Sequence, residues 1–337
     1  MGGIAQSVPP HVFEKTWPAS TRDWIEGEMH HMSKILVTGG AGFIASHIVD
    51  RLIQLQHKVL VADNLATGYR ENVNPAARFY EMDIRSPEFA RLIETERPEV
   101  ISHHAAQTMV RVSTEQPIYD TQVNVQGIIN LLTAAAKAGT RKVIFASSGG
   151  TVYGTCQHLP ITENEPFAPE SPYGISKTTS EFYLRYFADN YGVHYTSLRY
   201  ANIFGSRDTI SSEHVITVFA KRLLEGKPPI IHWDGEQAKD YLYVDDAVQA
   251  NVLALDHGDD QAYNIGFGQP VSVNEIYRLL VKITGINLQA QHGPKRMGDV
   301  RLFYFDCSKA KRELGWKPQM PFEEGVARTV EWFRQNI

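Results

Sequence analysis

Cysteine is nearly absent from this sequence of 337 residues, and the two that occur, Cys156 and Cys307, lie far apart and form no CxxC pair. This excludes a disulfide framework or a cysteine-based metal site, and it fits a reducing, cytoplasmic setting. Long apolar runs are also missing, since no stretch reaches the roughly 18 residues that a membrane helix needs. The first 32 residues lack the apolar centre of a secretory signal, and Gln6 stands where a myristoylation signal requires Ser or Thr.

An excess of positive charge is absent too. Lys and Arg number 33 and Asp and Glu number 38, which gives a formal net charge of −5. Without a basic run there is no electrostatic reason to expect nucleic acid or an anionic membrane as partner. The composition, 43% hydrophobic and 21% charged, is that of a globular protein, and the length corresponds to about two domains at ~150 residues each.

From residue 34 onward, short apolar runs alternate with amphipathic stretches. The expected strands are 34–38, 59–62, 77–82, 100–103, 142–146 and 195–200, and the expected helices are 43–56, 87–95, 118–138 and 173–191. This alternation predicts βαβ units and an α/β, Rossmann-type doubly wound parallel sheet. Beyond residue 205 it weakens, and short helices at 215–225, 245–256 and 272–284 predict a smaller mixed α/β lobe. The third of these helices begins with a Ser272–Glu275 capping box.

A glycine-rich turn, TGGAGFIA at 38–45, follows the first expected strand and opens the first helix. Gly39 permits the tight turn, and Gly42 lets a pyrophosphate approach the N–H groups at the positive end of the helix. Asp63 ends the second strand, where its carboxylate would bind a ribose 2′-hydroxyl and repel a 2′-phosphate. The pattern therefore predicts a site for NAD rather than NADP, with Asp83 and Ile84 near the adenine.

Tyr173 and Lys177 are four residues apart in an expected helix and so share one face. A free phenol has a pKa near 10. A neighbouring ammonium and the positive nicotinamide would lower the pKa of Tyr173 and favour a phenolate that can act as a base. Ser147 and Ser148 stand upstream at the carboxyl end of a strand, where open α/β sheets bind ligands.

In this order the motifs resemble the extended short-chain dehydrogenase/reductase superfamily, and within it the UDP-glucose 4-epimerase-like nucleotide-sugar epimerases. The resemblance runs from Lys34 to about Phe333. It rests on GGAGFIAS (39–46), DNLATG (63–68), DI (83–84), HHAAQ (103–107), SSGGTVYG (147–154), SPYGISK (171–177), LRYANIFG (198–205), DGEQAKDYLYVDDA (234–247), NIG (264–266), KRMGDV (295–300) and LGWKP (314–318).

The resemblance implies NAD as cofactor and a set of residues that contact it. These are Gly39, Gly42, Phe43, Ile44, Asp63, Asn64, Leu65, Thr67, Gly68, Asp83, Ile84, His104, Ala105, Ala106, Gln107, Asn124, Ser147, Tyr173, Lys177 and Tyr200. It divides the chain into an N-terminal extension of unknown role (1–32), an NAD-binding domain (33–205, to which about 238–265 return) and a mainly nucleotide-sugar-binding lobe (206–337). His103 and His104 are interpreted as lining and packing residues, and no metal site is predicted.

In the reaction that the resemblance implies, Tyr173 takes the proton of the sugar 4-hydroxyl while a hydride passes from C4 to NAD⁺. The 4-keto sugar then turns, and the hydride returns to its other face. A Ser or Thr hydroxyl assists at the 4-oxygen. Counting forward from the strand gives Ser148, whereas counting back from Tyr153 gives Gly149, so the loop carries an extra glycine. Ser148 is the prediction, with Thr151 as the alternative.

The resemblance also implies a set of substrate-contacting residues. These are Ser148, Gly149, Thr151, Tyr173, Asn202, His214, Val215, Lys239, Arg296, Asp299 and Phe303. Four of them, Asn202, Lys239, Arg296 and Asp299, would hold the UDP diphosphate and ribose. The family usually has Arg at 239 and Pro at 297, where this chain has Lys and Met. Phe303 falls where a bulky ring narrows the pocket against N-acetylated sugars, although it is also consistent with an ordinary core residue.

The predicted activity is therefore NAD-dependent epimerisation at C4 of a UDP-hexose, UDP-glucose or UDP-galactose, by a homodimer joined through two long helices as in the family. UDP-glucuronate and UDP-N-acetylhexosamines are alternative substrates. A sugar-nucleotide 4,6-dehydratase is an alternative enzyme, but it usually has Asp-Glu after the active hydroxyl, where this chain has Gly149-Gly150. A UDP-xylose synthase is a further relative. A non-enzymatic NAD-binding sensor would have no use for Tyr173 and Lys177.

Overall fold

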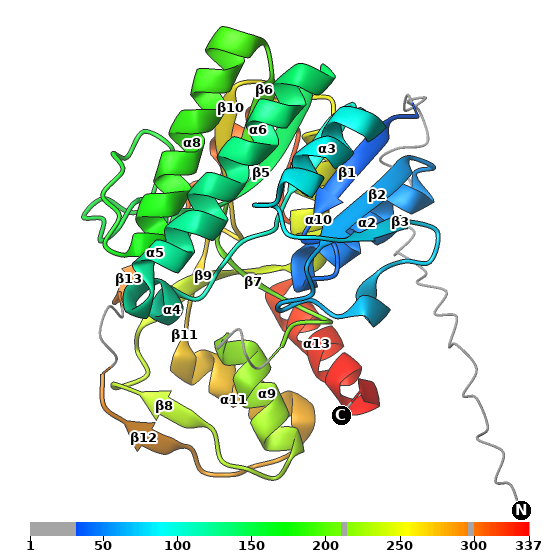
Figure 1. The fold of residues 1–337 in the computed structure, drawn as a ribbon. Helices are drawn as coiled ribbons and strands as arrows, with labels where there is room; N and C mark the ends of the chain where they lie inside the picture. Colours follow the sequence, from blue (N-terminus) through cyan, green and yellow to red (C-terminus); the bar gives the residue numbers. More distant parts are fainter. Residues whose placement is uncertain (1–31, 210–213, 296–299, 337) are drawn as a thin grey trace, which may run out of the picture. The chain divides into compact units, whose positions relative to one another are not determined.

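The computed structural model describes residues 32–209, 214–295 and 300–336 (Figure 1). Within the unit Ser33–Ile337, seven strands form one parallel sheet. Their spatial order is β10 (Gln261–Ile265), β6 (His194–Tyr200), β5 (Lys142–Ser148), β4 (Val100–His103), β1 (Lys34–Thr38), β2 (Lys58–Asp63) and β3 (Arg78–Glu81). The predicted doubly wound parallel sheet is confirmed, and β10 is a strand that the sequence pattern did not predict.

Helices cover both faces of this sheet, as Figure 1 shows. One face carries α3 (Pro87–Glu96), α6 (Gly127–Ala138) and α8 (Pro172–Tyr191), and the other carries α2 (Phe43–Gln54) and α10 (Val244–Leu253). Strand β1 shows why its sequence is a continuous apolar run: Leu36 packs in the core under the first set of helices, whereas Ile35 and Val37 pack under the second.

The region expected to be one helix at 118–138 is built differently. It consists of α5 (Pro117–Thr121), a π-helical segment η2 (Gln122–Gln126) and α6. The wider π turn is a feature often found at functional sites, and Asn124 within it is 4% exposed. A short helix, α4 (Val110–Glu115), precedes α5 and was not predicted.

The later part of the chain forms smaller sheets and further helices, most of which are seen in the lower half of Figure 1. The strands are β7 (Asn202–Phe204), β9 (Ala238–Tyr243), β11 (Pro270–Ser272) and β13 (Leu302–Phe303), with a separate pair β8 (Ile230–His232) and β12 (Gln291–Gly293). The helices are α9 (Val215–Leu224), α11 (Val273–Thr284), α12 (Ser308–Glu313) and α13 (Phe322–Asn336). The predicted Ser272–Glu275 capping box is present at the start of α11. No helix in the described residues is long and apolar enough to cross a membrane.

Candidate active site

The candidate site lies at the carboxyl edge of the large sheet. The strand order reverses between β1 and β4, because the chain proceeds outward through β2 and β3 on one side and through β5, β6 and β10 on the other. Ligands of open α/β sheets bind at such a reversal. Gly39 follows β1 and His104 follows β4, and the backbone N–H of His104 donates to Thr38 O of β1 at 3.2 Å, so the two loops meet at this point.

The glycine turn has the geometry that a pyrophosphate site requires. Gly39 has φ of +71°, and a Cβ there would lie 2.7 Å from Ala105 N. Gly42 caps α2 without any side-chain hydrogen bond, so the N–H groups of the first turn, which begins with Phe43 and Ile44, are not capped by a side chain. A Cβ on Gly42 would lie 3.1 Å from Gly39 O. The turn therefore fits an anion at the positive end of α2.

Asp63, at the end of β2, is 7% exposed, and its side chain is hydrogen-bonded to the glycine turn. Its Oδ2 accepts a hydrogen bond from Ala41 N at 2.9 Å, and its Oδ1 accepts one from Leu65 N at 2.8 Å. Burial raises the pKa of this carboxyl, against the downward effect of the two N–H groups. The following loop packs closely on the turn, since a Cβ on Gly68 would lie 2.8 Å from Ala41; Thr67 in this loop is exposed.

Asp83 is the centre of a polar cluster after β3. Arg85 donates to both carboxylate oxygens, at 2.9 and 2.7 Å, and Asn64 Nδ2 donates to Oδ2 at 3.2 Å. The Arg85 guanidinium lowers the pKa of Asp83 to about 2. Ile84 behaves differently from a pocket-lining residue, because its side chain packs in the core and its Cδ1 would lie 2.5 Å from a Cβ on Gly127.

The two histidines after β4 have separate partners. Nδ1 of His103 lies 2.7 Å from Thr38 Oγ1, and its ring stacks on Phe145. His104 Nε2 lies 3.2 Å from Asn251 Oδ1, and its ring stacks on Tyr200. Burial lowers the pKa of His103 well below its ordinary range and that of His104 to about 4. Both rings are therefore neutral at physiological pH.

The loop after His104 turns toward the π-helical segment. Ala105, Ala106 and Gln107 are each partly exposed. Gln107 is bound twice by Asn124: Gln107 N donates to Asn124 Oδ1 at 3.0 Å, and Asn124 Nδ2 donates to Gln107 O at 2.9 Å. The structure therefore brings these predicted cofactor residues together.

The structure brings the predicted residues Tyr173, Lys177 and Ser148 together: the first two are 8% and 4% exposed, and Ser148 is partly exposed. Helix α8 starts at Pro172 with Ser171 as its N-cap, which places Tyr173 in the first turn and Lys177 in the second. The Ser148 hydroxyl lies near the phenol of Tyr173 and acts to lower its pKa. Lys177 Nζ donates to Ala146 O at 2.8 Å and lies 5.7 Å from the centre of the Tyr173 ring. Thr151, the alternative hydroxyl, donates to Ser148 O at 3.3 Å.

The sequence predicts a lowered pKa for Tyr173, but the protein groups around it raise this pKa. Burial raises the pKa of Tyr173 above its ordinary value, because the phenolate is poorly solvated there, and the nearby Ser148 hydroxyl acts in the opposite direction. Burial also lowers the pKa of Lys177 to about 8, against upward contributions from Asp120 and Glu181. Lys177 therefore remains mainly protonated near neutral pH.

The extra glycine of the loop has a steric reason. Gly149 begins the short helix α7 (Gly149–Val152), and a Cβ on it would lie 2.0 Å from Cζ of Phe305. A Cβ on the next residue, Gly150, would lie 3.8 Å from Cζ of Phe303, an ordinary contact. Phe303 and Phe305 meet edge to face, with ring centres 4.8 Å apart. The ring of Phe305 therefore occupies the space that a side chain at 149 would need.

The predicted substrate residues of the later part gather around β9. Lys239 lies beside Phe303 of β13 in the strand register, and its charge acts on His214, which immediately precedes Val215 at the start of α9. Asn202 Nδ2 donates to Asp240 O at 2.9 Å. Arg296 and Asp299, the other predicted ligands of the UDP group, lie outside the described residues, as does Met297.

A buried ion pair behind the cluster was not predicted. Arg199 Nη2 donates to Glu181 Oε2 at 2.7 Å, and the two side chains are 8% and 7% exposed. Ser147, predicted to contact the cofactor, is 3% exposed and donates its hydroxyl to Glu181 Oε1 at 2.6 Å. Glu181 stands four residues after Lys177 on α8, and this spacing is the sequence signal that could have indicated it.

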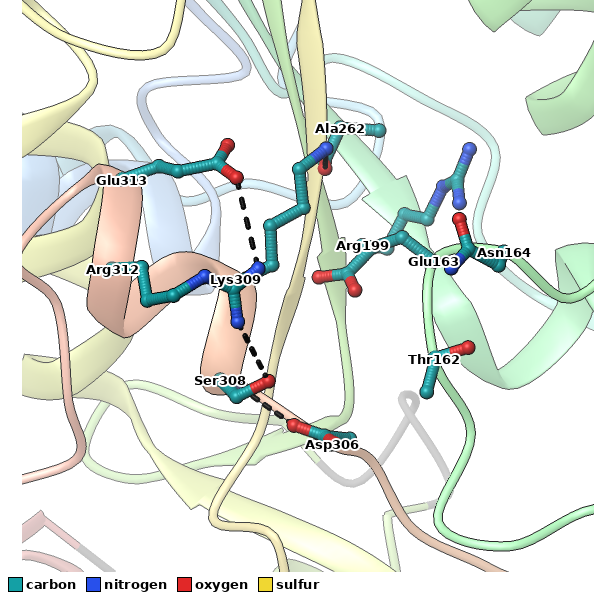
Figure 2. A pocket seen from close by; sticks show the side chains of 10 residues that line it. All are labelled: Thr162, Glu163, Asn164, Arg199, Ala262, Asp306, Ser308, Lys309, Arg312 and Glu313. Atoms are coloured by element: carbon teal, nitrogen blue, oxygen red, sulfur yellow. Dashed lines mark hydrogen bonds and ion pairs between the residues drawn. The ribbon is translucent and has the colours of Figure 1, made fainter.

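A polar cavity of about 510 Å³ lies beside the edge strand β10 (Figure 2). Figure 2 shows Lys309 reaching toward Ala262, whose carbonyl accepts a hydrogen bond from Lys309 Nζ at 3.0 Å. Its lining residues are Thr162, Glu163, Asn164, Arg199, Ala262, Asp306, Ser308, Lys309, Arg312 and Glu313. None of them is a predicted site residue, and one of them, Arg199, also forms the ion pair with Glu181.

Comparison with known proteins agrees with this geometry. Residues 35–266 match the NAD-dependent epimerase/dehydratase family. The chain belongs to this family. NAD is the cofactor of the family, and the uncapped turn of α2, the absent Cβ of Gly39 and the carboxylate of Asp63 fit that group.

Several relatives match the chain over nearly its whole length. The UDP-glucose 4-epimerase of Thermotoga maritima, solved with UDP-glucose, is 45% identical with a TM-score of 0.89, and the match covers 90% of this chain and 99% of that one. The Thermus thermophilus UDP-glucose 4-epimerase, solved with NAD, is 38% identical with a TM-score of 0.86, covering 90% and 100%. The UDP-glucose 4-epimerase of Mycolicibacterium smegmatis is 39% identical over 310 residues, covering 90% and 99%.

Proposed function

We propose that this chain is a UDP-hexose 4-epimerase that interconverts UDP-glucose and UDP-galactose through a transient 4-keto sugar. The observation that carries the proposal is the cluster in which the Ser148 hydroxyl lies near the buried Tyr173 phenol and Lys177 lies one turn further along α8. A phenol and a hydroxyl side by side suit a substrate alcohol that must lose and regain its proton. The similarity to UDP-glucose 4-epimerases supports the substrate class.

The residues that would hold NAD are those of the turn and its surroundings, above all Gly39, Gly42 and Asp63. When bound, NAD⁺ supplies a hydride acceptor with a positive ring. The chain itself supplies the acid–base chemistry: Tyr173 takes the proton of the 4-hydroxyl, Ser148 orients the 4-oxygen, and Lys177 contributes a fixed positive charge. Because burial raises the pKa of Tyr173, additional positive charge at the site favours the phenolate that the reaction needs.

The geometry at Gly149 favours an epimerase over a 4,6-dehydratase. A dehydratase of this family usually places an acidic side chain directly after the active hydroxyl. Here any side chain at that position would meet Cζ of Phe305 at 2.0 Å from its Cβ. The chain therefore has no carboxylate at positions 149 and 150, and no space for one at position 149.

The choice of sugar rests on the same aromatic pair. Phe303 and Phe305 are 5% and 1% exposed and pack against the Gly149–Gly150 backbone next to Ser148. Such a rigid apolar wall excludes a bulky N-acetyl group more effectively than it distinguishes two epimers of equal size.

We interpret residues 33–205, with about 238–265, as the NAD-binding part and the rest of 206–337 as the part that binds the nucleotide sugar.

Incubation with UDP-glucose, UDP-galactose, their N-acetyl forms and UDP-glucuronate, followed by NMR of the C4 configuration, tests the function. The expected result is interconversion of the first two alone. A 4-keto-6-deoxy product, or turnover of UDP-glucuronate only, would contradict the proposal. Tyr173→Phe is expected to bind UDP and NAD⁺ normally and to lose turnover by about 10²–10⁴-fold, the usual contribution of a positioned acid or base. Unchanged turnover would remove Tyr173 from the mechanism.

We also propose that the protein forms a homodimer through α5 and α8. Ile175, Phe182 and Tyr186 lie on one face of α8 and are 53%, 58% and 50% exposed. Ile118 of α5, a helix that contacts α8, is 74% exposed. Two neighbouring helices that each expose apolar side chains suit an isologous contact, in which a two-fold axis sets the same surface of a second copy against them.

Sedimentation velocity tests the dimer. Phe182→Glu is expected to give a monomer, because a buried carboxylate at the contact would be unpaired. Lys282→Glu, a charge change at an exposed position of α11, serves as the control and should remain dimeric. A monomeric wild-type protein, or a Phe182→Glu variant that stays dimeric, would refute this interface.

A further inference from the structure

A buried carboxylate that the proposed mechanism does not use lies beside the Tyr173–Lys177 pair. Asp120 of α5 is 0% exposed. Its Oδ2 accepts a hydrogen bond from Ser176 Oγ at 2.6 Å, and Ser176 stands between Tyr173 and Lys177 on α8. Its Oδ1 accepts from Gln107 Nε2 at 2.8 Å and from Asn124 Nδ2 at 3.0 Å. One carboxylate thus receives three side-chain donors.

These donors come from three segments that meet at the site. Gln107 belongs to the loop after β4, Asn124 to the π-helical segment and Ser176 to α8. Ser180 extends the network, since its Oγ donates to Ser176 O at 2.8 Å and to Asn124 O at 3.2 Å. Asp120 therefore connects the predicted cofactor loop to the helix that carries the proposed base.

The opposite charge of Lys177 explains why the buried carboxylate of Asp120 is tolerated at this position. Within the described ranges, neither Asp120 nor Lys177 forms an ion pair at contact distance, although both are buried. A buried charge without compensation is costly. Asp120 is hydrogen-bonded to Ser176, the residue before Lys177, and its negative charge raises the pKa of Lys177.

In the part of the chain that the structure describes, the neighbouring titratable groups named below are paired or neutral. On α8, Glu181 is bound to Arg199 of β6. On β4 and just after it, His103 and His104 are neutral because burial lowers their pKa values. On β6, Tyr200 accepts a hydrogen bond from Asn251, and burial raises its pKa. Among the described residues, two carboxylates act on Lys177, those of Asp120 and Glu181. Glu181 is paired with Arg199, whereas Asp120 is not paired with an arginine.

We propose that Asp120 is a positioning residue of the active site and the countercharge of Lys177: it keeps the lysine protonated and holds the first turns of α8 against the 104–109 loop. The proposal rests on the proposed function in that Tyr173 is taken as the base. Its consequence is electrostatic as well as structural. A negative charge near Tyr173 opposes loss of the phenol proton, so removal of that charge makes Tyr173 more acidic.

The experiment compares Asp120→Asn with Ser176→Ala. Asp120→Asn removes the charge, and the acid limb of the pH profile of kcat is expected to move down by about one pH unit, the size expected for one charge a few ångströms away in a partly buried site. Ser176→Ala removes the hydrogen bond and keeps the charge, so kcat is expected to fall while the limb stays in place. If Asp120→Asn does not fold, Asp120→Ser removes the same charge and leaves space for water.

A second readout does not depend on sugar turnover. The absorbance of the Tyr173 phenolate, measured by pH titration as the difference between each protein and its Tyr173→Phe counterpart, is expected to show the same downward shift. If the wild type turns over no UDP-sugar but this shift occurs, the proposed function fails and the role of Asp120 stands. Two results overturn the role proposed for Asp120. In the first, removal of the Asp120 charge leaves both the Tyr173 titration and the acid limb of the kcat profile as in the wild type. In the second, Ser176→Ala shows the same shift as the charge-removing variant.

Discussion

The contact between Gly149 and Phe305 gives the sharpest test of how the site is built. In Gly149→Ala the new Cβ would lie 2.0 Å from Cζ of Phe305. Carbon atoms pack at about 3.5 Å or more, so the two groups must separate by about 1.5 Å. Phe305 cannot easily yield, because it is 1% exposed, meets Phe303 edge to face, and donates its backbone N–H to Asp240 Oδ2 at 3.2 Å.

The expected cost follows from this confinement. Overpacking of this kind lowers the free energy of unfolding by about 1–3 kcal/mol. If the backbone moves instead of the ring, Ser148 moves with it, and a displacement of about 1 Å at an active site reduces turnover by about 10²-fold. Urea unfolding and kcat of the same preparations measure the two effects.

The neighbouring glycine supplies the control. In Gly150→Ala the new Cβ would lie 3.8 Å from Cζ of Phe303, so no steric cost is expected, and the change from Gly to Ala within α7 should be neutral or stabilising by up to about 1 kcal/mol. Phe305→Leu should recover part of the loss in Gly149→Ala, because the two positions are in contact and their effects are not additive. Equal stability and activity of the two alanine variants would refute the reasoning.

Two further predictions concern buried carboxylates. Asp63→Ser is expected to weaken NAD⁺ binding by about 1–3 kcal/mol, the range for hydrogen bonds to a charged group, and to reduce the preference over NADP⁺; calorimetry with both dinucleotides measures this, and an unchanged preference would contradict it. Burial raises the pKa of Asp240 to about 6, so its ionisation opposes folding, and the stability present below about pH 4 is lost as the pH rises through 6. Asp240→Asn should therefore lose less unfolding free energy between those values than the wild type, by on the order of 3 kcal/mol, and parallel stability curves would show the expectation to be wrong.

The large sheet could be predicted because its strands are buried on both faces. Strands 34–38 and 100–103 agree with the prediction to the residue, since a continuous apolar run needs no knowledge of its neighbours. Strand β10 escaped prediction because its sequence, QAYNI, mixes polar and apolar residues and pairs only with β6. The π turn at 122–126 also escaped, because its sequence, QVNVQ, has no glycine or proline that would interrupt the expected helix.

The residues of the site also fall into a group that the sequence could predict and a group that it could not. Gly39, Asp63 and the Tyr173–Lys177 pair were predictable because their chemistry depends on partners within a few residues or on the end of a strand. Phe305 and Asp120 were not, because they act on Gly149 and on Ser176, which are remote in sequence and become neighbours only in the folded chain.

Strand β10 has a consequence for how the protein is made. The sheet that carries the cofactor residues is completed by residues 261–265, which the ribosome adds only after β7, α9, β8 and β9. Until then β6 has one unpaired edge, which is open to wrong pairing with other chains. A fragment that ends near residue 205 therefore keeps every motif of the dinucleotide site and still carries this exposed edge, so excision or grafting of the first half should include a substitute for the missing strand.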